Sequence, residues 1–473
     1  MGSDAPLPHC FDGFPPRMNA YAEGEWVESA ARDANRYRID RKFWPTIGSK
    51  VHADLPQHYG RCDDVQPQRK LYAWRPSQCS LLPFQPSAAC KLLAGKQIVI
   101  VGDSTVFQTF LSLVHLLGGE FGRDVKHGYV TADLTAAACD GRLRINFIRS
   151  DLLLWTHSVP DYHAVQRCDG FTILHPFVHR ASRDADIVLL GIGHHFPRAL
   201  MLAEKWSVWD GQTAAKKARV GFFARNLNHT LASLLWRRAA WGHKDPQSVV
   251  ILGTSTPVRG CARFTAPLKA SGEAIDVAAG GGDESGNVTS NELRWMQYAR
   301  FNEVARRLAE SFGTSFLDVA APSALRPDGA MGRFWPPGSL VNGKSKQLDC
   351  VHYCLPGVVD TWPTLLYNLL TSRHLKAALG AVDADGKDGG ARGSHPRMRF
   401  LSANASEWLR VKGYAERFEG CMPSRGRLGA CEHRMQSLPW WPFRCIESRD
   451  RAARKGAQWS EHYKPWMPPE SFD

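Results

Sequence analysis

The 473-residue sequence has no stretch of about 18 consecutive apolar residues, the length needed to cross a bilayer, so no membrane span is expected. Its N-terminus lacks a basic segment followed by an apolar one, so no signal peptide is expected in this sequence. It also lacks a Cys-x-x-Cys pair and any block of about five or more like charges. These last two absences argue against a zinc ribbon and against a polybasic nucleic-acid-binding arm.

Composition places the chain among globular proteins. Apolar residues make up 44% and charged residues 22%, which excludes a disordered, collagen-like or coiled-coil chain. The net charge of +13 favours acidic partners such as nucleic acid, anionic lipid or acidic polysaccharide. Because the basic residues are scattered rather than clustered, we expect no nucleic acid partner.

Twelve cysteines are spread over the sequence, at positions 10, 62, 79, 90, 139, 168, 261, 350, 354, 421, 431 and 445. Dispersed cysteines in a large chain are typical of structural disulfides in an oxidising compartment. Three Asn-x-Ser/Thr sequons, at Asn228, Asn287 and Asn404, favour the same compartment as acceptors for glycosylation. Buried reduced thiols in a cytosolic protein remain the alternative.

Short apolar runs alternate with helical patterns in the middle of the chain. Strands buried on both faces are predicted at 97–101, 187–190, 249–252 and 316–319, and helices at about 106–117, 221–240, 291–312 and 360–378. This alternation predicts βαβ units and a mostly parallel sheet with helices on both faces.

Composition divides the chain into four predicted parts. They are an N-terminal segment packed on the core (1–92), an α/β domain (93–378), a flexible linker (379–396) and a C-terminal extension (397–473). The extension contains five tryptophans, at 408, 440, 441, 459 and 466, and three cysteines. That composition is too aromatic for a disordered tail, so we expect the extension to pack on the main body.

Gly102-Asp103-Ser104 is the first candidate for chemistry, since it lies where a predicted buried strand ends and a helix begins. Ligands of open α/β sheets bind at this carboxyl edge, and the N-terminus of a helix offers N–H groups to a developing oxyanion. Gly102 permits a tight turn there. The alternative is that Asp103 and Ser104 only cap the helix, and no Gly-x-Ser-x-Gly elbow is present to decide between the two.

Asp349 and His352 are the second candidate, three residues apart in one predicted loop. Histidine suits the removal of a proton from a serine near neutral pH, and a carboxylate on its other ring nitrogen fixes the tautomer and stabilises the imidazolium. The order Ser104, Asp349, His352 is one of several that support such a triad. The alternative is that His352 is an ordinary core histidine.

The same loop offers a rival zinc site. Cys350, His352 and Cys354 alternate along the chain, and His194 or His195 would be the missing fourth ligand. Alternate-residue spacing is unusual for zinc and a second close ligand pair is absent, so we expect no metal.

Two blocks of the sequence resemble motifs of the plant trichome birefringence-like polysaccharide O-acetyltransferases, which belong to the PC-esterase group of SGNH-type proteins. Gly102-Asp103-Ser104 is similar to the Gly-Asp-Ser block of that family. Residues 349–362, DCVHYCLPGVVDTW, are similar to its Asp-Cys-x-His-Trp-Cys-Leu-Pro-Gly-x-x-Asp-Thr-Trp block over one contiguous run. Further matches occur in the same order at 23–27, 74–76, 186–194, 255–261 and 325–329, so that the resemblance covers about 20–370.

The resemblance implies an SGNH-hydrolase-like three-layer α/β/α fold with a central, mostly parallel sheet. It implies that Ser104 is the nucleophile, His352 the base and Asp349 the residue that orients the base. The implied reaction moves an acetyl group, from a donor such as acetyl-CoA or an acyl carrier, to a polysaccharide hydroxyl through an acetyl-serine. No bound cofactor is implied. The implied location is the Golgi lumen or secretory pathway, although the sequence shows no N-terminal membrane anchor of the kind usual in the family.

The resemblance also implies how the catalytic loop is held. It pairs Cys261 with Cys350 and Cys62 with Cys354, so that both sides of His352 would be tied to distant parts of the chain. The positions that correspond to oxyanion or substrate-binding residues are Gly102, Asp103, Gly191, Gly193 and His194.

The sequence departs from the family pattern at three places. Gly191 stands where the family has Asn, His195-Phe196 replaces an aromatic pair, and Phe107-Gln108 replaces an Arg-Asn pair. If that Asn supplies an oxyanion donor, this chain must use backbone N–H groups or another side chain, because losing one donor costs about 10²–10³ in rate. Besides acetyl transfer to a polysaccharide, two functions therefore stay open: hydrolysis of acyl esters, and a non-catalytic glycan-binding or structural role. The basic charge favours an acidic, uronate-bearing glycan as the partner.

Overall fold

The computed structural model describes residues 7–12, 20–29, 62, 66, 69–121, 133–150, 152–153, 181–196, 212–258, 260–269, 297–334, 340–341, 344–345 and 349–384. Its centre is a seven-stranded sheet in the order β4-β5-β6-β3-β7-β8-β9. The strands are β3 (Gln97–Gly102), β4 (Glu120–Phe121), β5 (Asp133–Ala138), β6 (Leu143–Arg149), β7 (Ile187–Gly191), β8 (Val249–Leu252) and β9 (Ser315–Leu317). β6, β3, β7, β8 and β9 run parallel, and β4 and β5 form an antiparallel edge.

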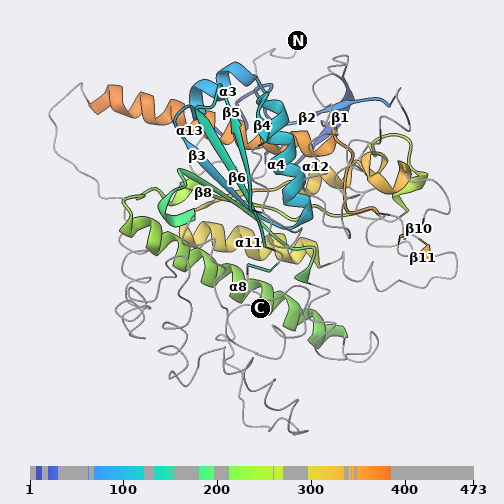
Figure 1. Cartoon of the computed structure of the whole chain (residues 1–473). Coiled ribbons are helices and arrows are strands. Elements are labelled where there is room, and N and C mark those ends of the chain that lie inside the picture. The colour runs from blue at the N-terminus through green and yellow to red at the C-terminus, as the bar shows by residue number, and fades with distance from the viewer. Residues whose placement is uncertain are drawn as a thin grey trace, which may run out of the picture.

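Helices cover both faces of this sheet (Figure 1). They are α3 (Pro86–Leu93), α4 (Ser104–Leu116), α8 (Gln212–Ala240), α11 (Tyr298–Phe312), α12 (Ala320–Ala324) and α13 (Thr361–Ala384). Short 3₁₀ turns lie at Pro246–Ser248, Cys261–Arg263, Pro327–Gly329, Met331–Phe334 and Val358–Asp360, and β10 (Leu340–Val341) pairs with β11 (Lys344–Ser345). α4 and α13 pack on one face, and α8 and α11 on the other. The fold is therefore the expected three-layer α/β/α sandwich.

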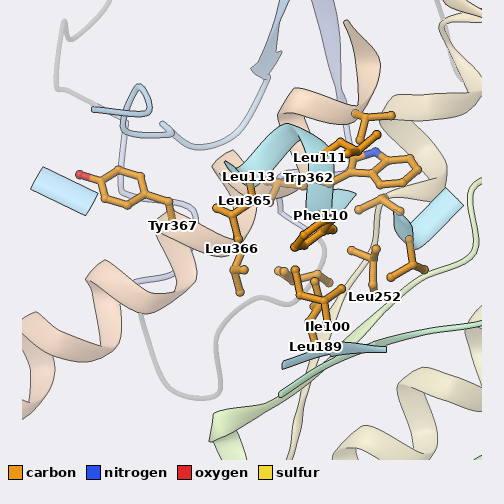
Figure 2. Packing of buried hydrophobic residues seen from close by; sticks show 14 of the residues in the cluster. Ile100, Phe110, Leu111, Leu113, Leu189, Leu252, Trp362, Leu365, Leu366 and Tyr367 are labelled. Atoms are coloured by element: carbon orange, nitrogen blue, oxygen red, sulfur yellow. The ribbon is translucent and has the colours of Figure 1, made fainter. Parts of the chain in front are cut away.

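Alternation along the strands builds the two halves of the core. On β3, Ile98 and Ile100 face the layer of α4 and α13, whereas Val99 and Val101 face the layer of α8 and α11. Figure 2 shows the first layer, in which Ile100, Leu189 and Leu252 of the sheet lie beneath Phe110 of α4 and Leu365 and Leu366 of α13. All six side chains are buried, and burying a side chain of this size contributes about 1.5–3 kcal/mol.

The predicted strands and helices correspond to β3, β7, β8 and β9 and to α4, α8, α11 and α13, so the predicted parallel sheet is confirmed. Sequence patterns missed β4, β5 and β6, which lie beside β3 and complete one side of the sheet. The available signal was Asp140-Gly141, a dipeptide typical of a tight turn between two strands. Cys139, Asp140 and Gly141 all have positive φ in this turn.

The N-terminal segment packs on the core through its described residues. β1 (Gly24–Glu28) and β2 (Tyr72–Pro76) form an antiparallel pair, and Trp26 Nε1 donates a hydrogen bond to the carbonyl of Pro322 at 2.8 Å. The guanidinium of Arg326 lies 4.7 Å from the centre of the Trp26 ring and 4.6 Å from that of Tyr72. This buried cation therefore joins the hairpin to the loop that follows α12.

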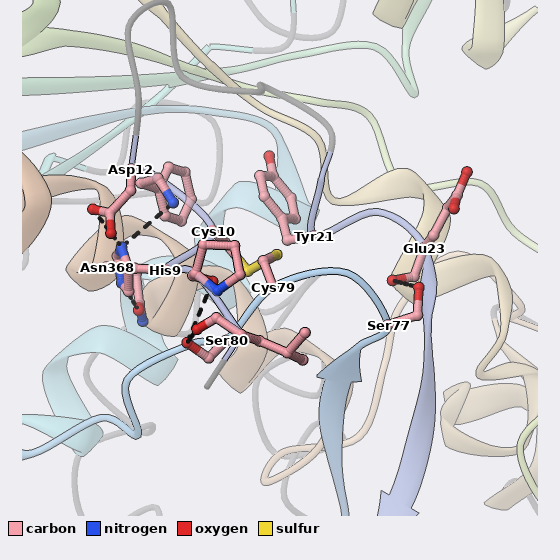
Figure 3. Close-up of a disulfide and its surroundings, with 12 residues drawn as sticks. His9, Cys10, Asp12, Tyr21, Glu23, Ser77, Cys79, Ser80 and Asn368 are labelled. Carbon is pink, nitrogen blue, oxygen red and sulfur yellow. Dashed lines mark hydrogen bonds and ion pairs between the residues drawn. A yellow bond between two sulfur atoms is a disulfide. The ribbon is translucent and has the colours of Figure 1, made fainter. Parts of the chain in front are cut away.

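A disulfide anchors the start of the chain, as Figure 3 shows. Cys10 is bonded to Cys79, and His9 Nε2 lies 2.9 Å from Oδ1 of Asn368 on α13. α13 continues to Ala384, into the segment predicted as a linker, and the rest of that linker and the extension at 397–473 lie outside the described residues. In the part of the chain that the structure describes, no helix is long and apolar enough to span a membrane.

Candidate active site

The order of the strands in the sheet reverses at β3. β6 lies on one side of β3 and β7 on the other, and Gly102 is in register with Arg149 of β6 and Gly191 of β7. Crevices of this kind, outside the carboxyl ends of parallel strands, are where open α/β sheets bind ligands. Ser104 is the first residue of α4, directly above this point.

Asp103 is the N-cap of α4 rather than an exposed substrate-binding group. Its carboxylate accepts hydrogen bonds from the backbone N–H of Thr105 at 3.0 Å and from the Thr105 hydroxyl at 2.7 Å, and the residue is fully buried. Burial alone would raise the pKa of Asp103, but His194 first, and then His195 and Arg149, outweigh burial and hold that pKa well below its usual range. The carboxylate therefore stays charged and orients the first turn that carries Ser104.

Ser104, His352 and Asp349 form a continuous hydrogen-bonded chain. Ser104 Oγ lies 2.7 Å from His352 Nε2, and His352 Nδ1 lies 2.9 Å from Asp349 Oδ2 and 3.1 Å from Oδ1. Backbone N–H groups of Val351 and His352 donate to Asp349 Oδ1, both at 3.1 Å. The carboxylate is thus fixed by its own loop, and it sets the proton on Nδ1 so that Nε2 can accept one from the serine.

The electrostatics of His352 suit a base. Burial by itself would lower the pKa of this imidazole, but the charge and hydrogen bond of Asp349 raise the pKa above its usual value. For Asp349, burial would raise the pKa, and the imidazole with the two backbone N–H groups lowers it instead. Asp349 is therefore ionised at neutral pH and stabilises the imidazolium that forms when His352 takes a proton.

One face of α4 holds the loop that carries His352. Ser104, Gln108 and Ser112 follow each other at intervals of one turn, so they share a face of the helix. Gln108 Nε2 donates to the carbonyl of Tyr353 at 2.6 Å, and the Tyr353 N–H donates to Gln108 Oε1 at 3.2 Å. Ser112 donates to Asp360 Oδ1 at 2.5 Å. Gln108 and Ser112 are fully buried, so these bonds set the distance between helix and loop.

Two disulfides also hold the loop that carries His352, one on each side of this residue in the sequence. The structure contains Cys261–Cys350 and Cys62–Cys354, the pairing that the resemblance implies, along with Cys10–Cys79 and Cys90–Cys139. Because Cys350 and Cys354 are each bonded to a distant cysteine, neither sulfur is available as a thiolate ligand, and the rival zinc site is removed. Among the described residues, no other group of His, Cys, Asp and Glu could hold a metal ion.

Comparison with known proteins places this site in a family. Residues 81–369 match the family model for PC-Esterase, described as a GDSL/SGNH-like acyl-esterase family found in Pmr5 and Cas1p. The chain belongs to the PC-esterase family. It is 24% identical over 324 residues to xyloglucan O-acetyltransferase 1 of Populus trichocarpa, covering 63% of this chain and 71% of that protein. It is 26% identical over 360 residues to protein trichome birefringence-like 40 of Arabidopsis thaliana, covering 74% and 87%.

Within this PC-esterase domain, Gly102 and Gly191 have a packing role. A Cβ on Gly102 would lie 2.1 Å from the carbonyl oxygen of Gly191, and a Cβ on Gly191 would lie 2.5 Å from Cγ2 of Val106. Val106 therefore occupies the space that a side chain at position 191 would need. Gly193 is crowded in the same way, since its Cβ would meet Thr254 Oγ1 at 2.0 Å. An Asn at position 191 would not fit beside Val106.

His194 belongs to a buried network behind Ser104. Its Nε2 lies 2.9 Å from the carbonyl oxygen of Ser255, and its Nδ1 lies 3.3 Å from Asp103 Oδ2 and 3.3 Å from the Thr105 hydroxyl. A carbonyl and a carboxylate only accept hydrogen bonds, and the Thr105 hydroxyl already donates to Asp103. Ser255 Oγ also lies 3.5 Å from the same Nε2, so these contacts hold the His194 ring beneath the first turn of α4.

Gln108 and Arg149 lie at this site, although the sequence motifs do not mark them as functional, whereas Ser255 belongs to the stretch 255–261 that resembles a family segment. The i, i+4 spacing of Gln108 from Ser104 was a usable signal, because the two share a helix face. Arg149 had no local signal, since its position depends on which strands become neighbours in the sheet.

Proposed function

We propose that this protein transfers an acetyl group to a hydroxyl of a cell-wall or extracellular polysaccharide through an acetyl-Ser104 intermediate. The observation that supports this proposal most directly is the 2.7 Å contact between Ser104 Oγ and His352 Nε2, backed by Asp349. The names of similar proteins point to the same reaction, since they include xyloglucan O-acetyltransferase 1 of Populus trichocarpa and xylan O-acetyltransferase 7 of Oryza sativa.

In the first half of the proposed reaction, Ser104 Oγ attacks the carbonyl carbon of the acetyl donor as its proton passes to His352 Nε2. The C=O electron pair moves to oxygen, and collapse of this oxyanion expels the donor's leaving group with the proton from His352. In the second half, His352 takes the proton of a sugar hydroxyl, whose oxygen attacks the acetyl carbon. Ser104 then leaves as the alkoxide and recovers its proton from His352.

Attack by water in the second half would make the same site an acyl esterase. The triad serves both outcomes, and the difference lies in whether a sugar hydroxyl or water reaches the acetyl carbon. The four disulfides support work in an oxidising compartment such as the secretory pathway, and the net charge of +13 favours acceptors that carry uronate. The acetyl donor, acetyl-CoA or another acyl carrier, is a substrate rather than a bound cofactor.

The test is to incubate the purified protein with an acetyl donor, with and without xylan, xyloglucan or pectin, and to follow acetate release and glycan acetylation by mass spectrometry. We expect acetylated glycan, and the loss of turnover in Ser104→Ala. Ser311→Ala, at an exposed position of α11, is the matched control. Free acetate without acetylated glycan would establish the esterase. The absence of both products would indicate a non-catalytic relative.

A further inference from the structure

Arg149 is a buried cation at the same sheet edge as Ser104. It is the last residue of β6 and is in register with Gly102 at the end of β3. Residues in register on neighbouring parallel strands point to the same face, so the Arg149 side chain leaves the sheet on the side of α4. Only 6% of the residue is exposed, which is unusual for an arginine, because a buried charge needs partners.

The guanidinium reaches across the end of β3. Its Nη2 donates to Nε2 of His195 at 3.3 Å, and His195 belongs to the loop that follows β7. Because β6 and β7 lie on opposite sides of β3, this contact spans the carboxyl end of β3, the strand that leads to Ser104.

An attacking Ser104 needs donors for the oxyanion that forms on the acetyl carbonyl. The N–H groups of the first turn of α4 are one source, because the first N–H groups of a helix have no partner within it. Position 191 supplies no side-chain donor, and Val106 fills the space where one would lie. A guanidinium carries five planar N–H donors and a permanent charge, so it can serve His195 and a second acceptor together.

We propose that the Arg149 guanidinium donates hydrogen bonds to the oxyanion formed when Ser104 attacks an acyl carbonyl. This inference rests on the proposed function, because it requires Ser104 to act as the nucleophile. The bond between Ser104 Oγ and the acyl carbon forms, the serine proton goes to His352, and the C=O electron pair settles on the oxygen that Arg149 holds. When the leaving group departs, that pair forms the C=O bond again and the negative charge beside Arg149 is lost.

Two other roles of Arg149 would give different effects when the residue is substituted. As a buried counter-charge to Asp103 alone, it would stabilise the first turn of α4 but would not affect the rate of the folded enzyme. As a binding group for the carboxylate of an acidic glycan, it would affect only the KM of such acceptors.

The test uses a fluorophosphonate, which forms a Ser104 Oγ–P bond, expels fluoride and passes the serine proton to His352. It requires the nucleophile and the oxyanion donors but no particular acetyl donor or glycan. We expect Arg149→Met to slow labelling of Ser104 by about 10²–10³ and to lower kcat for acetyl release by a similar factor, with the KM of the acceptor little changed. Arg144→Met is the matched control, because Arg144 is an exposed arginine on the same strand. We expect it to label at the wild-type rate.

Arg149→Lys is the second variant, and it is also the one to use if Arg149→Met does not fold. It separates the effect of the positive charge from that of the guanidinium geometry. Lysine keeps the charge that Asp103 would need but lacks the planar fork, so we expect slow labelling at an unchanged melting temperature. Wild-type labelling in either folded variant, or a loss limited to the KM of acidic acceptors, would overturn the inference and leave Ser104 as the nucleophile. If the wild-type protein is not labelled at Ser104 at all, the proposed function fails first.

Discussion

Ser104 Oγ lies 2.7 Å from His352 Nε2, although 248 residues separate the two in the chain. This contact depends on three separate supports: the N-cap of α4 at Asp103, the polar face of α4 and two disulfides around the loop. A catalytic group must be held to within about half an ångström of its working position, which explains why so much structure converges on one short loop.

Asp349→Asn should lower kcat severely while leaving the protein folded. An amide can still contact the imidazole, but it favours the wrong tautomer, and the same substitution in a serine-protease triad costs about 10⁴. His352→Ala should lower kcat at least as much. Steady-state acetate release measures both effects, and normal rates in the two variants would remove the triad from the mechanism.

The pH profile should have an acid limb above the ordinary pKa of histidine. His352 must be neutral to accept the serine proton, and Asp349 raises its pKa, so kcat/KM should fall as the pH drops through that raised value. In Asp349→Asn the raising charge is gone while burial remains, so the limb should move to lower pH. A limb that stays in place would show that a group other than His352 titrates.

Gln108→Met should reduce kcat without a comparable loss of stability. The substitution keeps the length of the side chain but removes both hydrogen bonds to the backbone of Tyr353, which hold His352 opposite Ser104. A misplacement of about 1 Å can cost about 10² in rate, so we expect a loss of that order. The melting temperature and the rate of Ser104 labelling are measured together. An unchanged labelling rate would show that the disulfides alone position the loop.

Removing the Cys261–Cys350 bridge with paired serine substitutions should impair catalysis more than removing Cys90–Cys139. Each bridge closes a long loop and contributes about 2–4 kcal/mol to stability. Only Cys350 adjoins the catalytic loop, whereas Cys90 and Cys139 flank the opposite, amino edge of β3. The melting temperature should therefore fall in both double variants, whereas kcat should fall chiefly in the variant that lacks Cys261–Cys350. Non-reducing peptide mapping of the native protein checks the pairing, and free thiols at Cys350 and Cys354 would contradict it.

Gly191→Ala should destabilise the fold, and Val106→Ala should relieve that cost. The new Cβ would lie 2.5 Å from Val106 Cγ2, and overpacking of this kind costs about 1–3 kcal/mol. In a double-mutant cycle, the loss in free energy of unfolding of the paired variant should be smaller than the sum of the losses of the two single variants. Simple additivity would show that the two positions do not compete for the same space.

The sequence by itself determined the order of the main strands and helices and the parallel character of the sheet, and it singled out the three residues that the structure joins by hydrogen bonds, Ser104, His352 and Asp349. These features are carried by local periodicity and by short contiguous motifs, such as Gly102-Asp103-Ser104 and the run from Asp349 to Trp362, so neighbours in the chain suffice to recognise them. The disulfides around His352 followed from the resemblance rather than from any spacing.

Only the tertiary structure decided which residues surround the triad. Arg149 lies beside Gly102 because β6 pairs with β3, and β6 was itself missed by the sequence pattern. Val106 can replace a side chain at position 191 only because β7 is the other neighbour of β3. The physical reason is the same in each case: strand order and register are set by the packing of the whole sheet between its helices, so contacts across strands are not encoded in any one segment of the chain.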